Sequence, residues 1–408
     1  MRIATSTIYE TGTSQLGTLQ SKMARTQQQL ATNRRMLTPS DDPIASARAL
    51  EVTQSKSVNS QFAVNRENAR ASLSQVELGL TSATTLIQDV QSIAVSAGNG
   101  VLSAANRESL AVQLSANLED LLGIANKTDG TGNYLFSGYK SSTVPFGQTA
   151  TGAQYQGDQG QRQLQVGSSR QIAISDSGSS VFENNKTGNG TFTMAAAAGN
   201  TGAGVVSTGS VSNAAALTGH KYEISFAVSG TPAVTTYSVL DKNTGQPPAG
   251  APGPQPYQSG QQIEFDGMAF SVKGTPAAGD KFSAEPSTKQ SIFTTLTDLI
   301  ATLRAPASTP ADAAKLSNGL RKAQENLGAS LDNVLSVRAS VGSRMKELDT
   351  LDSAGEDLNI QFETTLSNLQ DLDVVKAISE FTQQQAQLEA AQKSFKSLSG
   401  LSLFNYIG

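Results

Sequence analysis

Apolar residues near the N-terminus recur at the spacing of one helix face. Their gaps alternate between three and four residues, which is typical of a helix that packs along a second helix. The positions are Leu16, Leu19, Met23, Thr26 and Leu30. Pro39 disfavours helix at the residue before it, whereas Asp42 is a good N-cap and Pro43 suits the first helical position. We therefore expect one helix to end and the next to begin around residues 37–43.

The next segment carries the most regular pattern in the chain. From Phe62 to Ala97, gaps of four and three residues alternate without interruption, and Arg66 is the only polar member. A helix from Pro43 to Ala97 would be about 80 Å long at 1.5 Å per residue. The glycines around Asn99 should end it, and a shorter helix is expected from about residue 104 to residue 126.

The C-terminal flank repeats this helical pattern. Apolar residues from Leu316 to Leu348 mark one long amphipathic helix, and the stripe continues to Leu372. Beyond it, apolar residues recur every seven positions, a spacing that calls for a helical partner when several heptads keep it. The positions are Val374, Phe381, Leu388 and Phe395.

The middle of the chain has a different composition. Most of the 36 Gly and 13 Pro lie between Pro145 and Pro286. Five short segments there alternate in polarity or carry β-branched and aromatic residues, which predicts strands. Residues 184–213 and 245–260 are dominated by small and polar residues, so we expect them to be loops. The predicted strands are 162–166, 171–174, 221–228, 235–240 and 268–273.

These patterns predict a mainly α fold with a β insertion. Neither helical flank could bury its apolar stripe alone, so both chain ends should build a long antiparallel helical rod, or coiled-coil bundle. This rod would carry a mid-chain, β-rich outer domain. The stripes at the two ends would form only a thin two-helix ribbon, which buries little apolar surface. We expect them to complete their packing on neighbouring subunits, although an internal core is the alternative. The residues in question are Leu16, Leu19, Met23, Leu30, Phe381, Leu388, Phe395 and Leu398.

Residues with catalytic or metal-binding chemistry are scarce. The chain has no Cys, and His220 is its only histidine, so Cys-based and multi-histidine zinc sites are excluded. His220 remains the single candidate for a catalytic triad, but no motif surrounds it. The pair Asp41-Asp42 is better explained as a helix cap than as a metal site, and no glycine motif for phosphate is present. We therefore expect neither an enzyme nor a cofactor.

Charge and hydropathy narrow the range of partners. A net charge of −4 provides no basic field for nucleic acid or anionic lipid. No stretch approaches the roughly 18 consecutive apolar residues of a transmembrane helix. The first residues also lack the apolar run of a secretory signal peptide. We expect no nucleic-acid or membrane partner, and any export from the cell should use a route that does not read such a signal.

Four segments carry a family resemblance. Residues 30–47, which contain Pro39-Ser40-Asp41-Asp42-Pro43, resemble the N-terminal signature shared by flagellins and flagellar hook-associated proteins. The stretch Tyr134-Leu135-Phe136-Ser137-Gly138-Tyr139, together with residues 155–162 and 401–407, is similar to the branch of this family that joins hook and filament. The resemblance covers residues 1–183 and about 288–408, and it leaves the middle of the chain without a recognised signature.

The resemblance implies a structural protein of the bacterial flagellum that polymerises through its terminal helices. Its partners would be further copies of itself in a ring, the first hook-associated protein and flagellin. Members of this family are exported through the type III export apparatus, without a cleaved signal peptide, and a chaperone binds the C-terminal helix. The protein would then be extracellular, in the flagellum.

The domain organisation follows from pattern and resemblance together. We expect an inner domain of residues 1–36 with 365–408, a rod of 37–140 with 288–364, and an outer β domain of 145–286. A flagellin filament subunit is the nearest alternative function. Alternatives from other classes are a soluble coiled-coil signalling or scaffold protein and an enzyme that uses His220.

Overall fold

The structure, a computed structural model, describes residues 5–100, 102–251 and 253–400. The chain forms two compact units, which we call the terminal unit and the central unit. The terminal unit consists of Met1–Val64 with Thr350–Gly408, and the central unit is Asn65–Asp349. The long helices α2 (Pro43–Ala97) and α5 (Pro310–Gln370) contribute residues to both.

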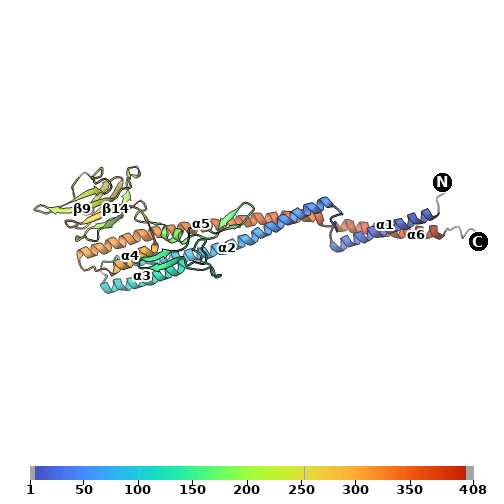
Figure 1. The fold of residues 1–408 in the computed structure, drawn as a ribbon, viewed down its shortest axis with the longest axis horizontal. Helices are drawn as coiled ribbons and strands as arrows, with labels where there is room; N and C mark the ends of the chain where they lie inside the picture. The colour runs from blue at the N-terminus through green and yellow to red at the C-terminus, as the bar shows by residue number, and fades with distance from the viewer. Residues whose placement is uncertain (1–4, 101, 252, 401–408) are drawn as a thin grey trace, which may run out of the picture. The chain divides into compact units, whose positions relative to one another are not determined.

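Two pairs of helices make up the described part of the terminal unit. The first pair is α1 (Thr5–Thr32) with α6 (Val374–Gly400), which lie side by side in Figure 1. The second is the start of α2 with the end of α5, where the Asn59 amide donates a 2.8 Å hydrogen bond to the Gly355 carbonyl. The helix boundary expected around residues 37–43 is confirmed, because α1 ends and α2 begins on either side of it. The continuous stripe to Leu372 is interrupted, because this residue lies between α5 and α6.

The helices of the central unit agree with the regular pattern of the sequence. The α2 seam is buried from Ala69 to Ala97, and α3 (Ala104–Ala125) follows where a shorter helix was expected. Ser103 caps α3 by accepting the N–H of Asn106 at 3.2 Å. A fourth helix, α4 (Ile292–Arg304), packs on α3 and was not predicted from the sequence.

Short strands follow α3 and pack close to the helices. The strands β1 and β2 form an antiparallel hairpin that contacts α3 and α4, and β3 pairs with β4 in the same way. A π-helical turn and the short strand β5 come next, and β5 pairs with β15, which immediately precedes α4. The bounds are β1 (Phe146–Thr149), β2 (Gly152–Tyr155), β3 (Gln163–Gln165), β4 (Gln171–Ala173), η1 (Ser179–Glu183), β5 (Asn185–Lys186) and β15 (Lys289–Gln290).

The remaining strands form a β domain with its own core. One sheet has the antiparallel order β11-β10-β9-β14-β6, and another has the order β12-β13-β7, with β8 also paired to β13. Aromatic and aliphatic side chains from both sheets share one buried cluster, which includes Tyr222, Phe226 and Phe282. The bounds are β6 (Phe192–Ala196), β7 (Val205–Val206), β8 (Ser210–Val211), β9 (Tyr222–Ser229), β10 (Val234–Asp241), β11 (Gln255–Pro256), β12 (Gln262–Phe265), β13 (Met268–Lys273) and β14 (Lys281–Pro286).

Of the two loops expected in this region, the first was wrong and the second was largely confirmed. Residues 184–213 are not a loop, because β6 lies within them as a sheet strand beside β14, and β5, β7 and β8 lie there too. Among their described residues, 245–260 form a loop as expected, apart from the two-residue strand β11. The small residues that looked typical of a loop are tolerated because Phe192 and Met194 supply the buried apolar contacts of β6.

Candidate assembly site

The predicted terminal stripes face each other across the α1–α6 pair. On α1, Leu16, Leu19, Met23 and Leu30 are all half-buried. On α6, Phe381 and Phe395 are half-buried and Leu388 is buried, whereas the side chain of Leu398 lies outside the described residues. The structure thus brings these apolar side chains together within one chain.

Two specific contacts set the α1–α6 register. The Thr26 hydroxyl, which interrupts the apolar stripe of α1, is buried and lies 3.1 Å from the Gln384 side-chain oxygen. The rings of Tyr9 and Phe395 meet edge to face with centroids 4.8 Å apart. A Cβ at Gly12 would come within 2.7 Å of the Phe395 ring, so a larger residue there would displace this ring from its contact with α1.

The breaks between the helices meet at one place, which we call the joint (residues 33–42 and 371–373). The Arg35 N–H donates to the Gln370 carbonyl at 2.8 Å, and the Leu372 N–H donates to Asn33 at 3.3 Å. The Arg35 guanidinium adds a 3.0 Å bond to the Leu369 carbonyl. Asn33 has a left-handed φ of 51°, which turns the chain out of α1. Both breaks are therefore stabilised by contacts between distant parts of the sequence.

The residues of the Pro39–Pro43 signature build this joint. Asp42 accepts the Ala45 N–H at 3.0 Å and caps α2, which begins at Pro43 as expected. Asp41 accepts the N–H groups of Thr38 and Leu37 and lies 2.8 Å from the Arg25 guanidinium.

The environment of Asp41 changes its acidity. The backbone bonds from Thr38 and Leu37, followed by the charge of Arg25, hold the pKa of Asp41 below its usual value. The hydroxyl of Ser40 lies 2.8 Å from that of Thr38. The acidic pair therefore positions the chain between two helices.

The Tyr134–Tyr139 stretch folds the loop after α3 onto an aromatic cluster. Leu135, Phe136 and Ser137 are buried, and the Phe136 ring meets that of Phe182 at 5.4 Å. Gly138 has a φ of 75°, a conformation that favours glycine. Tyr139 is exposed on the surface. Most of this stretch is therefore buried in the core of the fold, and Tyr139 is the residue that faces solvent.

Asp158 holds the other side of this loop. Its carboxylate accepts the N–H groups of Tyr139, Lys140 and Gly160 at 2.8–3.1 Å. These bonds, led by the one from Tyr139, hold the pKa of Asp158 below its ordinary value. Burial raises the pKa of the neighbouring Tyr155 to about 12, and its hydroxyl donates to Asp158 and Phe136 carbonyls.

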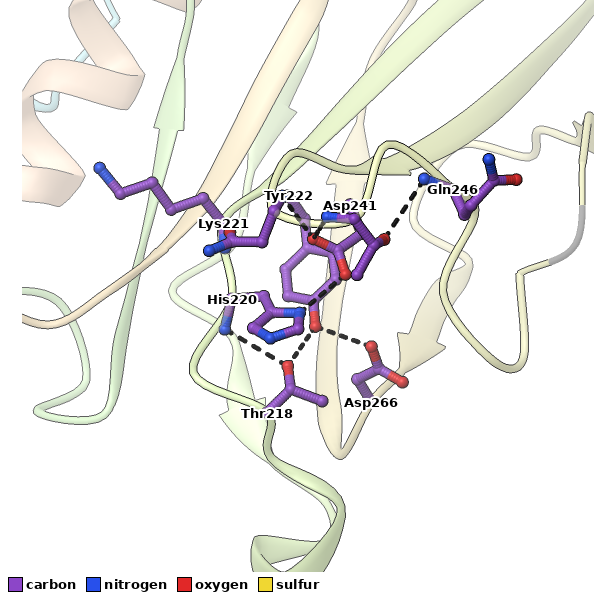
Figure 2. A network of polar contacts seen from close by, with 9 residues as sticks. Thr218, His220, Lys221, Tyr222, Asp241, Gln246 and Asp266 are labelled. Carbon is purple, nitrogen blue, oxygen red and sulfur yellow. Dashed lines mark hydrogen bonds and ion pairs between the residues drawn. The ribbon is translucent and has the colours of Figure 1, made fainter.

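His220, the one catalytic candidate, pairs with a carboxylate in the β domain. Its Nδ1 lies 2.7 Å from Asp241 Oδ2, and Figure 2 shows this contact beside Tyr222, whose hydroxyl donates to Asp266 at 2.7 Å. Asp241 also accepts the N–H of Asn243 at 2.8 Å in the turn after β10. In the part of the chain that the structure describes, no hydroxyl group hydrogen-bonds to the His220 ring.

The cluster around His220 ties the start of β9 to the end of β10. Burial alone would raise the pKa of Asp241, but the hydrogen bonds from His220 and the following turn hold it below its usual value. Burial also raises the pKa of Tyr222 to about 12. At neutral pH the Asp241 carboxylate is therefore charged and the Tyr222 hydroxyl is neutral. Both side chains form hydrogen bonds at this end of the β9–β10 hairpin.

Sequence reasoning missed a row of polar side chains on α5. The Asn318 amide accepts the Val206 N–H and donates to the Gly204 carbonyl, both at 3.0 Å. Arg321 donates to the Met194 carbonyl at 2.7 Å. These side chains satisfy backbone groups of the β domain and attach it to the helix. No periodic signal could reveal them, because their partners lie more than a hundred residues away.

Sequence reasoning also missed the apolar residues on the outer faces of the terminal unit. Ile44 and Leu50 of α2, Ile360 of α5, and Val375 and Ile378 of α6 are all largely exposed. Exposed apolar side chains that gather on one surface mark interaction sites more often than isolated ones do. The periodicity analysis did not identify these exposed residues, because they do not belong to the apolar stripes that follow heptad spacing.

A membrane span and a metal site are two further classes of site that the described ranges could hold. No helix within them is long and apolar enough to cross a membrane. Within the same ranges, no three His, Cys, Asp or Glu side chains gather in a way that could hold a metal ion.

The chain is similar to known flagellar proteins along its whole length. Residues 3–141 match the bacterial flagellin N-terminal helical region. Over 405 residues the chain is 31% identical to flagellar hook-associated protein 3 of Salmonella typhimurium and 29% identical to that of Escherichia coli. Each alignment covers 99% of this chain and 99% of the relative. The crystal structure of the flagellar junction protein from Legionella pneumophila superposes with a TM-score of 0.71 and 32% identity over 79% of this chain and 100% of that one. This chain therefore belongs to the flagellar hook-associated protein 3 family.

Proposed function

We propose that this chain forms a ring of identical subunits that joins the flagellar hook to the filament, and that it assembles through its terminal helices. Its family makes it a structural protein of the bacterial flagellum. The observation that carries the proposal is the full-length similarity to hook-associated protein 3 together with a terminal unit whose outer faces carry exposed apolar residues. Exposed apolar residues that gather on one surface favour burial against another protein.

The partners and the route to the flagellum belong to the same proposal. On one side the ring contacts the first hook-associated protein, and on the other it contacts flagellin. The chain reaches this place, outside the cell, through the type III export apparatus and without a cleaved signal peptide. A cytoplasmic chaperone holds the α6 region before export, since the half-buried and exposed apolar residues of α6 would otherwise promote aggregation.

A non-catalytic role is also part of the proposal. The His220–Asp241 pair has its hydrogen bonds engaged in the β9–β10 hairpin, which supports a structural role for the only histidine. A flagellin filament subunit is less favoured, because the relatives that match the chain along its whole length carry the hook-associated name.

Immunogold labelling of sheared, intact flagella tests the function directly. An antibody against residues 145–286 should give one cluster of gold where hook meets filament, and flagella from a strain that lacks the gene should give none. Label along the whole filament would instead make the protein a flagellin. Flagella without any label would contradict both assignments.

A further inference from the structure

Asn-Gly pairs are positions where a protein chain is able to modify itself without an enzyme. Glycine has no side chain to hinder its backbone nitrogen, so this nitrogen is able to attack the carbonyl of the preceding Asn side chain. The chain has three such pairs, at residues 99–100, 189–190 and 318–319. We propose that Asn99-Gly100, in the turn between α2 and α3, is a site of spontaneous deamidation and that the fold protects the other two pairs.

The reaction is a ring closure followed by hydrolysis, and it needs only water and hydroxide. Hydroxide removes the proton of the Gly100 nitrogen, which then forms a bond to Cγ of Asn99. The bond from Cγ to Nδ2 breaks, and Nδ2 takes a proton from water and leaves as ammonia. Water opens the cyclic imide at either of its two carbonyls, which gives aspartate or isoaspartate. Both products carry one new negative charge, and isoaspartate also lengthens the backbone by one carbon.

The turn after α2 leaves the reacting nitrogen open to solvent. Helix α2 ends at Ala97 and α3 begins at Ala104, and both Asn99 and Gly100 are exposed between them. Within the described ranges the Gly100 N–H donates no hydrogen bond to the protein, so water is its partner. Hydroxide therefore reaches the nucleophile of this pair without any prior opening of the fold.

The pair at residues 318–319 lies inside α5, where the same nitrogen is engaged. In the interior of an α-helix each N–H is donated to the carbonyl four residues earlier, so the Gly319 N–H is already bonded. Asn318 is buried, and its amide group forms two 3.0 Å hydrogen bonds, to the Val206 N–H and the Gly204 carbonyl. Ring closure here would break a helical bond and both contacts to the β domain.

The pair at residues 189–190 is held by hydrogen bonds on both of its reacting groups. The Gly190 N–H donates to the Thr187 carbonyl at 3.3 Å. The Asn189 side-chain oxygen accepts the N–H groups of Thr191 and Phe192 at 3.0 and 2.9 Å. Reaction at this pair, as at residues 318–319, requires a local opening of the structure first.

Peptide mass spectrometry of the full, folded chain tests the proposal. The chain is incubated at mildly alkaline pH in water labelled with heavy oxygen, which marks every new carboxyl group because its added oxygen comes from solvent. Asn99 should deamidate at least about tenfold faster than Asn189 or Asn318, since one net hydrogen bond lowers the population of the reactive open state by about this factor.

The same chain denatured in urea is the matched control. Without the fold the three pairs have the same chemistry, so they should react at similar rates. Equal rates at the three pairs in the folded chain would overturn the proposal. So would a folded chain that reacts fastest at residue 189 or 318, or one that stays unmodified at Asn99 while the denatured chain reacts there.

A substitution at Gly100 tests the identity of the nucleophile. A Cβ at Gly100 would meet no atom within 4 Å, and this residue has no left-handed φ, so Gly100→Ala should fold with an unchanged circular dichroism spectrum. Deamidation at Asn99 should then fall severalfold, because the added methyl group hinders ring closure, while the rates at Asn189 and Asn318 stay the same. An unchanged rate at Asn99 in this variant would contradict attack by the Gly100 nitrogen.

Discussion

At the scale of single residues, a few carboxylates organise the irregular parts of this chain. The Asp158 carboxylate accepts hydrogen bonds from three backbone N–H groups. The Asp41 carboxylate accepts two such bonds and also forms an ion pair with Arg25. Asp129 works in the same way. Burial alone would raise its pKa, but hydrogen bonds from Thr131 and Asn133 lower it to about 2. Charge-assisted bonds of this kind give a loop a defined shape without regular secondary structure.

The family stretch around Phe136 should matter for stability more than for contacts with other proteins. Phe136 is completely buried and packs on Phe182, so Phe136→Ala should lower the free energy of unfolding by about 3–5 kcal/mol. Urea denaturation followed by circular dichroism measures this change. Tyr139→Ala, at the exposed end of the same stretch, should change it by less than about 0.5 kcal/mol. Equal effects of the two substitutions would contradict this division.

At the scale of elements, the α1–α6 pair is the thinnest part of the described chain. Most of its side chains are exposed or half-buried, and Leu388, Ala377 and Thr26 are its buried residues within the described ranges. A two-helix pair with so little buried surface is marginal by itself. Its few buried positions therefore have a large influence on whether the helices stay together.

A charge at Leu388 should separate the two helices. Leu388→Glu removes a buried leucine, which costs about 2–5 kcal/mol, and adds a carboxylate that has no partner there. Hydrogen exchange should then quicken in α1, remain slow in α3, and the variant should be absent from flagella. Gln385→Glu adds the same charge at an exposed position of α6 and serves as control. Slow exchange in α1 of Leu388→Glu would show that the pair does not depend on this contact.

At the scale of the whole molecule, the β domain is an insertion with adjacent ends. The Ser287 N–H donates to the Thr191 carbonyl at 2.9 Å. The neighbouring segments of the chain, β5 and β15, pair with each other on the side of the helices. The chain therefore leaves and returns at one place. The domain also has a core of its own, so its folding and that of the helices are separable to a first approximation.

Removal of the β domain should accordingly leave the helices folded. Replacing residues 192–286 by a short Gly-Ser linker reconnects Thr191 with Ser287, whose backbones already touch. Far-ultraviolet circular dichroism should keep its helical signal per molecule, while Tm falls because the Asn318 and Arg321 contacts are lost. A linker of equal length that replaces α4 (Ile292–Arg304) should abolish cooperative unfolding, since α4 is buried against α3. Collapse of helicity in the β-domain deletion would show that the helices need it.

Much of the helical architecture could be predicted from the sequence alone. The bounds of α2, its cap at Asp42, the shorter α3 and the break near Gly98 follow from local signals: repeat spacing, capping preference and glycine. All five predicted strands were found. The segments at 162–166, 171–174, 221–228, 235–240 and 268–273 correspond to β3, β4, β9, β10 and β13. These features were accessible because the residues that determine them lie within a few turns of one another.

The missed elements had weaker local signals. The helix α4 is short, and β6, β12 and β14 depend on neighbours in their sheets, since β6 gains its strand conformation from β14 almost ninety residues away. For the candidate site, the periodicity selected the seam of α1 and α6, but the exposed residues of the outer faces do not repeat in a recognisable pattern.

By itself, then, the sequence determined the long helical segments, although not the short α4, and which face of each long helix is apolar. The tertiary structure alone decided which residues of α1 and α6 touch, how the joint between residues 33–42 and 371–373 is held, and which apolar residues of α2 and α5 remain exposed. The physical reason is that periodicity is set by neighbours along the chain, whereas burial depends on contacts between segments hundreds of residues apart.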